Sequence, residues 1–188
     1  PELETSVLSV CFSMSYLHFF FSDGIAGIAS LRISNELGAD NPRAVKMVSK
    51  VVLLVGASEV LIVCVPLFAW RGDVGYLFSN DNEVVEYVGE VIPYMCISMI
   101  MDTMKCVLNG IIRGCGWQSI GMYVNLVAYD VVGLPFAAFL AFLAHMRGKG
   151  LLIGLTLGTF LHVSFLGFKT FTSDWNQQAS NTQERLLK

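Results

Sequence analysis

The chain has 188 residues, of which 54% are hydrophobic and 14% charged, and its mean hydropathy is +0.61. Soluble domains of this length are far less apolar, so the composition indicates an integral membrane protein. A formal net charge of −3 without a cluster of Lys or Arg argues against nucleic acid as a partner, because phosphate binding requires concentrated positive charge.

Five apolar runs reach the roughly 20 residues that a helix needs to cross about 30 Å of hydrocarbon. In chain order they are residues 5–31, 43–70, 84–112, 117–144 and 150–172. The sequence therefore predicts an all-α, polytopic bundle of five transmembrane helices in a lipid bilayer.

Charges and prolines are sparse within these runs. Asp23 is the single charge of the first run, and Glu59 interrupts the second. Either packing against a polar partner or a role in transport would explain Glu59, and we favour packing. Helices that contain proline are often bent, so we expect bends at Pro66, Pro93 and Pro135.

Short polar connections join the runs and leave no room for a second domain. Residues 173–188 are polar, and we expect a mobile cytoplasmic tail there, with Trp175 at the membrane interface. If the C-terminus is cytoplasmic, an odd number of spans puts residues 1–4 on the outer side of the membrane. No translocation signal precedes these residues, so we expect upstream helices to be missing.

Positive charge predicts the orientation, because cytoplasmic loops carry an excess of Lys and Arg. Nine such residues gather on one side against three on the other, Arg71, Arg147 and Lys149. The first loop, the third loop and the C-terminus are therefore predicted to be cytoplasmic. The nine are Arg32, Arg43, Lys46, Lys50, Lys105, Arg113, Lys169, Arg185 and Lys188.

Neither the cysteines nor the histidines form a metal or nucleophile motif. The five cysteines lie in or beside apolar runs without a C-x-x-C pair, so we interpret them as apolar packing residues. His18, His145 and His162 lie on different elements without acidic or sulfur partners at helical spacing, and we expect each to be hydrogen-bonded or interfacial. We predict neither a metal site nor an enzyme.

Asp102 is the most unusual residue of the chain. It lies 12 residues after Glu90 and 11 before Arg113, which places it roughly 16–18 Å from either end of its helix and near the membrane midplane. A lone carboxylate there costs about 2.5–3.5 kcal/mol, and this cost favours its protonated form. The acid is therefore either a proton switch or a structural group that Lys105 neutralises from the same helix face.

A polar stripe surrounds Asp102, because Ser98, Asp102, Lys105, Asn109 and Arg113 recur at steps of three or four residues. It should face a cavity or another helix, as a solute pathway or as interhelical packing.

The next run adds Asn125 and Tyr129 on one face, followed by Asp130. Two intramembrane aspartates are also a feature of intramembrane aspartyl proteases, but the Gly-x-Gly-Asp motif of those enzymes is absent.

Several segments resemble plant MATE (multidrug and toxic compound extrusion) transporters. "ASLRISNELGADNPRAVK" (29–46) is similar to the cytoplasmic loop after their eighth helix, and the likeness continues through residues 78–88, 96–126, 132–140 and 147–154. The resemblance implies helices eight to twelve of a fold with two six-helix lobes, so that this chain would be a partial C-terminal lobe.

The resemblance also implies a function. Plant MATE proteins are proton-coupled antiporters that export organic solutes or xenobiotics at the tonoplast or plasma membrane, with the proton as coupling ion and no cofactor. Asp102 matches the acidic position of their tenth helix, Asn125 a polar position of the eleventh, and residues 114–118 the intervening loop. Lys105 stands where the family commonly has Gln, and Asp130 where it commonly has an aromatic residue.

We therefore expect a secondary transporter with Asp102 as its proton-coupling residue and a small organic solute as substrate. The residues predicted to line the cavity are Lys105, Asn109, Asn125, Tyr129 and Asp130. The alternative is a truncated, non-transporting membrane fragment that acts at most as an interaction partner.

Overall fold

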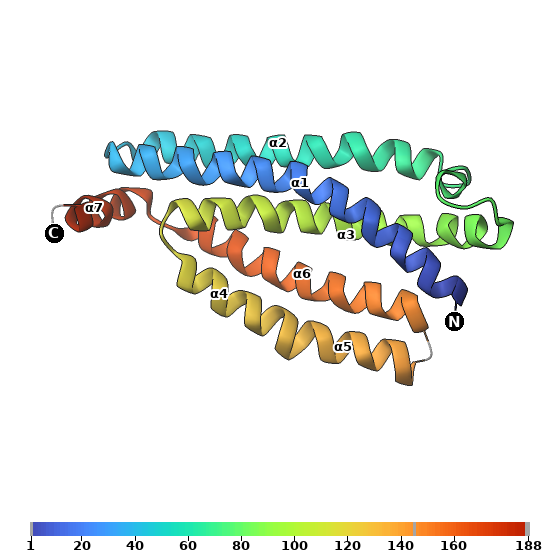
Figure 1. Ribbon diagram of the computed structural model, residues 1–188. Coiled ribbons are helices and arrows are strands. Elements are labelled where there is room, and N and C mark those ends of the chain that lie inside the picture. Colours follow the sequence, from blue (N-terminus) through green and yellow to red (C-terminus); the bar gives the residue numbers. More distant parts are fainter. Residues whose placement is uncertain (1, 145, 187–188) are drawn as a thin grey trace.

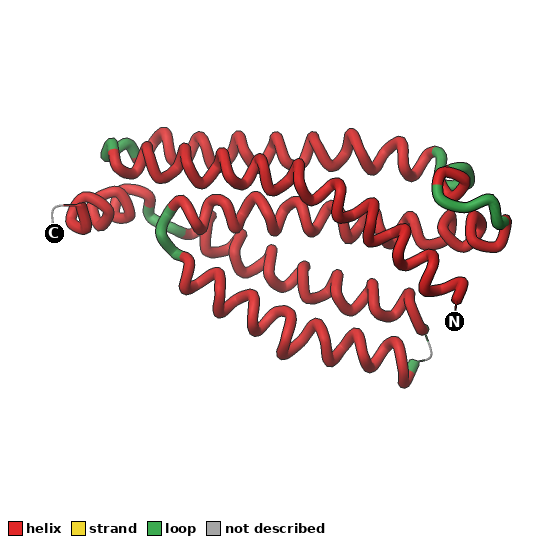
Figure 2. Tube along the Cα trace, viewed as in Figure 1, coloured by secondary structure: helices red, strands yellow, loops and turns green. Residues whose placement is uncertain are grey.

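Helices make up nearly all of the computed structural model, which describes residues 2–144 and 146–186. Figure 2 shows loops only where one helix gives way to the next, and the described residues contain no strand. A helix satisfies its backbone hydrogen bonds internally, as hydrocarbon surroundings require. The predicted all-α class is confirmed.

The long helices follow the predicted apolar runs. They are α1 (Glu2–Gly38), α2 (Pro42–Ala69), α3 (Asn82–Gly114) and α6 (Arg147–Thr172). Between α3 and α6, one continuous helical segment is assembled from α4 (Gln118–Leu126), η2 (Val127–Gly133), α5 (Leu134–Ala138) and η3 (Phe139–Leu143). Both η2 and η3 are π-helical, whereas η1 (Val74–Leu77) is a short 3-10 helix after α2.

Four of the five predicted spans are helices long and apolar enough to cross a membrane. They are Pro42–Ala69, Asn82–Gly114, Gln118–Leu143 and Gly150–Thr172. The fifth, predicted at residues 5–31, is also a single long helix but is not in this set of described segments. It also continues to Gly38, into residues that we had predicted to be loop.

Local chemistry explains where the helices begin and end. The side chain of Asn41 accepts a hydrogen bond from the Ala44 amide, and Pro42 occupies the first turn of α2, where a missing N–H costs nothing. Asp81 caps α3 through the Glu83 amide at 3.0 Å. After α3, Gly116 adopts a φ of 72°, a left-handed conformation that glycine reaches without strain.

The central element of the bundle is α3 (Figure 1). Half of its most apolar window is buried inside the structure, against 22–33% for the other three candidate spans. It packs against α1 and α2 on one side and α6 on the other, and the α4–η3 segment packs against α6. Two apolar clusters fill the interior, one around Ile92 and Met95 and the other around Ile33 and Ile111.

The expectation of a mobile tail after Ser173 is wrong, because α7 (Trp175–Leu186) folds back across the end of the bundle (Figure 1). Asp174 starts this helix by accepting hydrogen bonds from the amides of Asn176 and Gln177. Gln178 donates to the carbonyl of Cys115, and Gln183 donates to that of Gly38. Because Ala179 is fully buried and Trp175 stacks on Trp117, α7 is an integral part of the bundle.

These contacts place three regions at one end of the molecule. Gly38 ends α1 just before the first connection, Cys115 opens the third connection, and α7 donates to the carbonyls of both. The first connection, the third connection and α7 therefore lie at the same end of the bundle.

Candidate functional site

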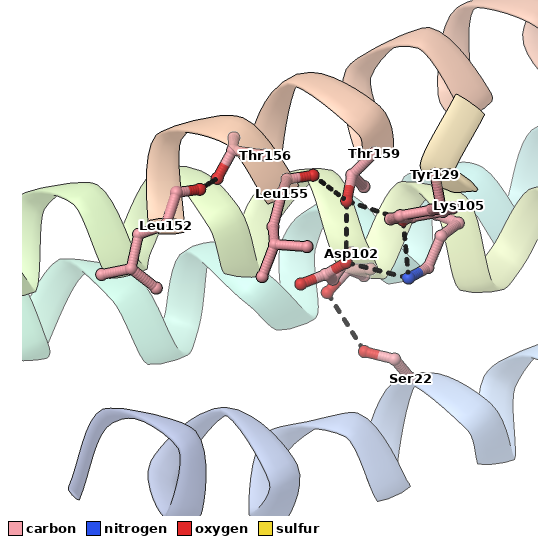
Figure 3. A network of polar contacts seen from close by, with 9 residues as sticks. Ser22, Asp102, Lys105, Tyr129, Leu152, Leu155, Thr156 and Thr159 are labelled. Carbon is pink, nitrogen blue, oxygen red and sulfur yellow. Dashed lines mark hydrogen bonds and ion pairs between the residues drawn. The ribbon is translucent and has the colours of Figure 1, made fainter. Parts of the chain in front are cut away.

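Asp102 lies at mid-helix on α3 and is bonded to its neighbour one turn away. The Lys105 Nζ donates to Asp102 Oδ1 at 3.0 Å, and their side chains are 23% and 36% exposed, respectively. The hydroxyl of Thr159 on α6 lies 3.4 Å from the same oxygen (Figure 3). One carboxylate oxygen thus accepts hydrogen bonds from two helices.

Tyr129 extends this network to the π-helical segment η2. Its hydroxyl accepts from Lys105 Nζ at 3.1 Å and lies 2.7 Å from Thr159 Oγ1 (Figure 3). The Thr159 hydroxyl is also within 3.2 Å of the Leu155 carbonyl, the usual position for a threonine bonded to its own helix. Four polar side chains from α3, η2 and α6 therefore form a closed ring of contacts inside the membrane region.

The Asp102 cavity, as we call it, is a hollow of about 220 Å³ between α1 and α3. The Ser22 hydroxyl lies 3.1 Å from that of Thr103 on its wall. Asp102 is thus exposed to a polar-lined space as well as paired. The polar residues of the lining are Ser15, Tyr16, His18, Ser22, Asp102, Thr103 and Lys105.

A second hollow of about 420 Å³, the Asn109 cavity, continues along α3 toward α4. Lys105 and Phe19 line both hollows, so this pair separates the Asp102 cavity from the Asn109 cavity. An ion pair between Arg113 and Asp23, 3.7 Å long, also lies on its wall. Its other polar lining residues are Cys106, Asn109, Gln118, Asn125 and His162.

The structure brings together most of the predicted site residues. Lys105, Asn109 and Asn125 line one cavity, and Tyr129 contacts Lys105 without lining either hollow. Asp130 is different, because it is exposed and makes no polar contact with a described residue. Tyr129 and Asp130 are adjacent on η2, so their side chains point in different directions. The side chain of Tyr129 points toward α3, and that of Asp130 points away from it.

Two buried histidines were not recognised as site residues in the sequence. His18 on α1 pairs with Glu59 on α2 at 3.0 Å, which supplies the polar partner expected for Glu59. His162 is 1% exposed, and neither of its ring nitrogens has a hydrogen-bond partner among the described residues. The expectation that it is hydrogen-bonded or interfacial is therefore wrong, because it lies inside the bundle edge-on to the Tyr129 ring. His145 lies outside the described residues.

All five cysteines are buried, which agrees with their interpretation as packing residues. Among residues 2–144 and 146–186, no three His, Cys, Asp or Glu side chains are grouped as metal ligands would be. Another hollow, of about 640 Å³, lies near the α2–α3 connection around Arg71 and Glu86, at the end of the bundle opposite α7.

Comparison with known proteins supplies a family for this geometry. The family model described as MatE matches residues 1–139. Protein DETOXIFICATION 8 and Protein DETOXIFICATION 6 of Arabidopsis thaliana are 39% and 43% identical to the chain over 187 residues, which is 100% of the chain and 39% of each relative. The chain thus spans about two fifths of the length of these curated relatives.

A solved structure agrees with the sequence relatives. It is titled "Crystal structure of eukaryotic MATE transporter AtDTX14", is 40% identical, and superposes with a TM-score of 0.91 over 98% of this chain and 41% of that one. The likeness extends over all the long helices of the bundle.

Proposed function

Because the chain belongs to the MatE family, we propose that it forms the C-terminal part of a secondary transporter that exports organic solutes in exchange for protons. The rest of the transporter would be an N-terminal lobe on a longer polypeptide. The observation that supports proton coupling is the position of Asp102, a carboxylate at mid-helix that lines a polar cavity. Intramembrane carboxylates of this kind commonly mark ion and proton pathways.

The proposed exchange uses the ring of contacts around Lys105. A proton that binds Asp102 removes its negative charge, so the hydrogen bond from Lys105 loses most of its electrostatic attraction. Lys105 then keeps Tyr129 as a partner and is free to turn toward the Asn109 cavity. Loss of the Asp102 charge changes the electrostatic field in the adjoining Asn109 cavity and would weaken the binding of a solute there.

The proposed solute site is the Asn109 cavity. Its amides, from Asn109 and Asn125, offer donors and acceptors, whereas Ile112 and Met122 supply apolar surface. A mixed lining of this type is typical of sites for small organic molecules.

We further propose that the end of the bundle that carries α7 faces the cytoplasm, and that the membrane is the tonoplast or the plasma membrane. Arg43, Lys46 and Lys50 at the start of α2 support this side, because positive loops remain cytoplasmic.

The test uses a chimera in which this chain replaces the corresponding C-terminal region of AtDTX14. Acid-loaded vesicles that contain the chimera should take up fluorescent organic dyes, and Asp102→Asn should abolish the part of the uptake that depends on the pH gradient. Asp73→Asn, an exposed acid in the α2–α3 connection, is the matched control and should leave uptake unchanged. Full pH-driven uptake by Asp102→Asn would refute the proposed role, and a chimera inactive toward every dye would favour a non-transporting chain.

A further inference from the structure

A second pair of titratable groups lies within the bundle and has no part in the exchange described above. His18 Nε2 on α1 is 3.0 Å from one carboxylate oxygen of Glu59 on α2 and 3.1 Å from the other. Their side chains are 5% and 20% exposed, respectively. Both residues lie well inside their helices, so the pair is in the membrane region.

Such a pair is sensitive to the number of protons it holds. With one proton it is either an imidazolium beside a carboxylate or an imidazole beside a carboxylic acid, and it is neutral in both forms. One more proton gives imidazolium and carboxylic acid with a charge of +1, and one fewer leaves imidazole and carboxylate with a charge of −1. Buried groups that interact so closely titrate as a unit.

The pair has access to the same space as Asp102. His18 lines the Asp102 cavity together with Asp102, Thr103 and Lys105. The cavity of about 220 Å³ has room for roughly seven water molecules at about 30 Å³ each. Its polar lining supplies several hydrogen-bond partners for such waters.

We propose that the His18–Glu59 pair is a second proton-binding site on the Asp102 cavity, which gains and loses a proton in electrostatic communication with Asp102. This inference deepens the proposed function, on which it rests, because two sites on one cavity would change the number of protons exchanged for each solute.

Other titratable groups surround the pair on every packed element. Tyr16 on α1 lines the same cavity, and Asp102 and Lys105 face it from α3. On α2, the Cys64 thiol interacts electrostatically with Glu59 and donates a hydrogen bond to the Cys96 carbonyl of α3. Of these groups, only Asp102 and Lys105 carry charge near neutral pH, and their mutual ion pair is neutral as a whole.

The experiment is nuclear magnetic resonance of the 188-residue chain in lipid nanodiscs, with ¹⁵N in its three histidine rings. The ring signal that is lost in the His18→Gln variant is the signal of His18. The signal is followed from about pH 5 to 8, and a proton-binding site should change its protonation state as the pH changes. Asp102→Asn leaves the Lys105 charge unbalanced, and it should shift the midpoint by roughly half a pH unit or more. Glu59→Gln, which keeps a hydrogen-bond acceptor, should also shift it.

Glu36→Gln is the matched control, because Glu36 pairs with the exposed Arg32 at 3.0 Å and lines no described cavity around Asp102. It should leave the His18 signal unchanged. A His18 ring that keeps one protonation state over the whole range, or a titration that Asp102→Asn does not move, would overturn the inference. The resonance measurement does not need transport, so the two proposals can fail separately. A chimera without transport, together with a His18 ring that changes protonation state, would refute the proposed function alone. A transporting chimera, together with a His18 ring that keeps one protonation state, would refute the second site alone.

Discussion

The ammonium group of Lys105 lies 3.0 Å from a carboxylate oxygen of Asp102, on the same face of α3 and one turn away. The same nitrogen is 3.1 Å from the hydroxyl of Tyr129, so Lys105 bridges the acid and the π-helical segment η2. The acid that we propose to bind protons thus has a cation of its own chain beside it. Lys105 competes with the proton for Asp102.

Lys105→Gln removes this competitor and keeps a hydrogen-bond donor at the same position. We expect pH-driven dye uptake by the chimera to rise roughly two- to fivefold, the factor that corresponds to about 0.5–1 kcal/mol for a partly exposed ion pair. Initial uptake rates in acid-loaded vesicles measure the effect. Lys50→Gln, an exposed lysine of α2, should leave the rate unchanged. Unchanged or lower uptake by Lys105→Gln would contradict competition.

Tyr129→Phe tests the bridge between helices. The substitution keeps the ring and removes a hydroxyl that lies 2.7 Å from Thr159 Oγ1 and accepts from Lys105. We expect a loss of about 0.5–1.5 kcal/mol in the free energy of unfolding, the usual net value of a hydrogen bond. Thermal unfolding in nanodiscs measures it, with the exposed Tyr123→Phe as control. Equal stability of the two variants would show that the bridge does not hold η2 in place.

Sequence patterns predicted the elements of the fold better than the contacts between them. The polar stripe on α3 follows from helical spacing, and the structure places Lys105 and Asn109 on one cavity as that spacing predicts. The pairing of His18 with Glu59 joins two helices 41 positions apart, and no spacing within one helix encodes it. Such contacts depend on the rotation of each helix about its axis and on the shift of one helix relative to the other along that axis.

The expectation of a mobile tail fails for a local reason. Residues 173–188 are polar, but Asp174 is a good N-cap residue, and Gln178 of α7 donates to the carbonyl of Cys115 at the end of α3. Asp130 follows Tyr129 directly in η2, and adjacent residues of a helix point in different directions, so it makes no polar contact with the network around Lys105.

Close helix contact at Gly110 gives a prediction about packing. A Cβ atom at this position of α3 would overlap the backbone of Ala26 on α1. Gly110→Ala should therefore force the helices apart and cost about 1–3 kcal/mol of unfolding free energy. Gly24 on α1 has open space around it, so Gly24→Ala should be neutral or slightly stabilising. Thermal unfolding of both variants in nanodiscs makes the comparison, and equal losses would show that α1 and α3 do not touch at Gly110.

Cys115 reports on whether α7 covers the end of the bundle in solution. It follows the last residue of α3 and is 3% exposed, and burial raises the pKa of its thiol to about 12 despite an opposing effect of Lys169. Only the thiolate reacts with alkylating reagents, so at pH 8 Cys115 should react at least roughly a hundredfold more slowly than a free cysteine.

Removing residues 174–188 takes away Gln178 and Trp175, which admits water and should raise the rate at Cys115 severalfold. Mass spectrometry of alkylated peptides measures the rate at each cysteine separately, and Cys11, distant in sequence and part of the other apolar cluster, serves as the internal control. Rapid alkylation of Cys115 in the intact chain would mean that α7 does not stay docked, whereas slow alkylation that removal of α7 relieves would establish it as a fixed cover.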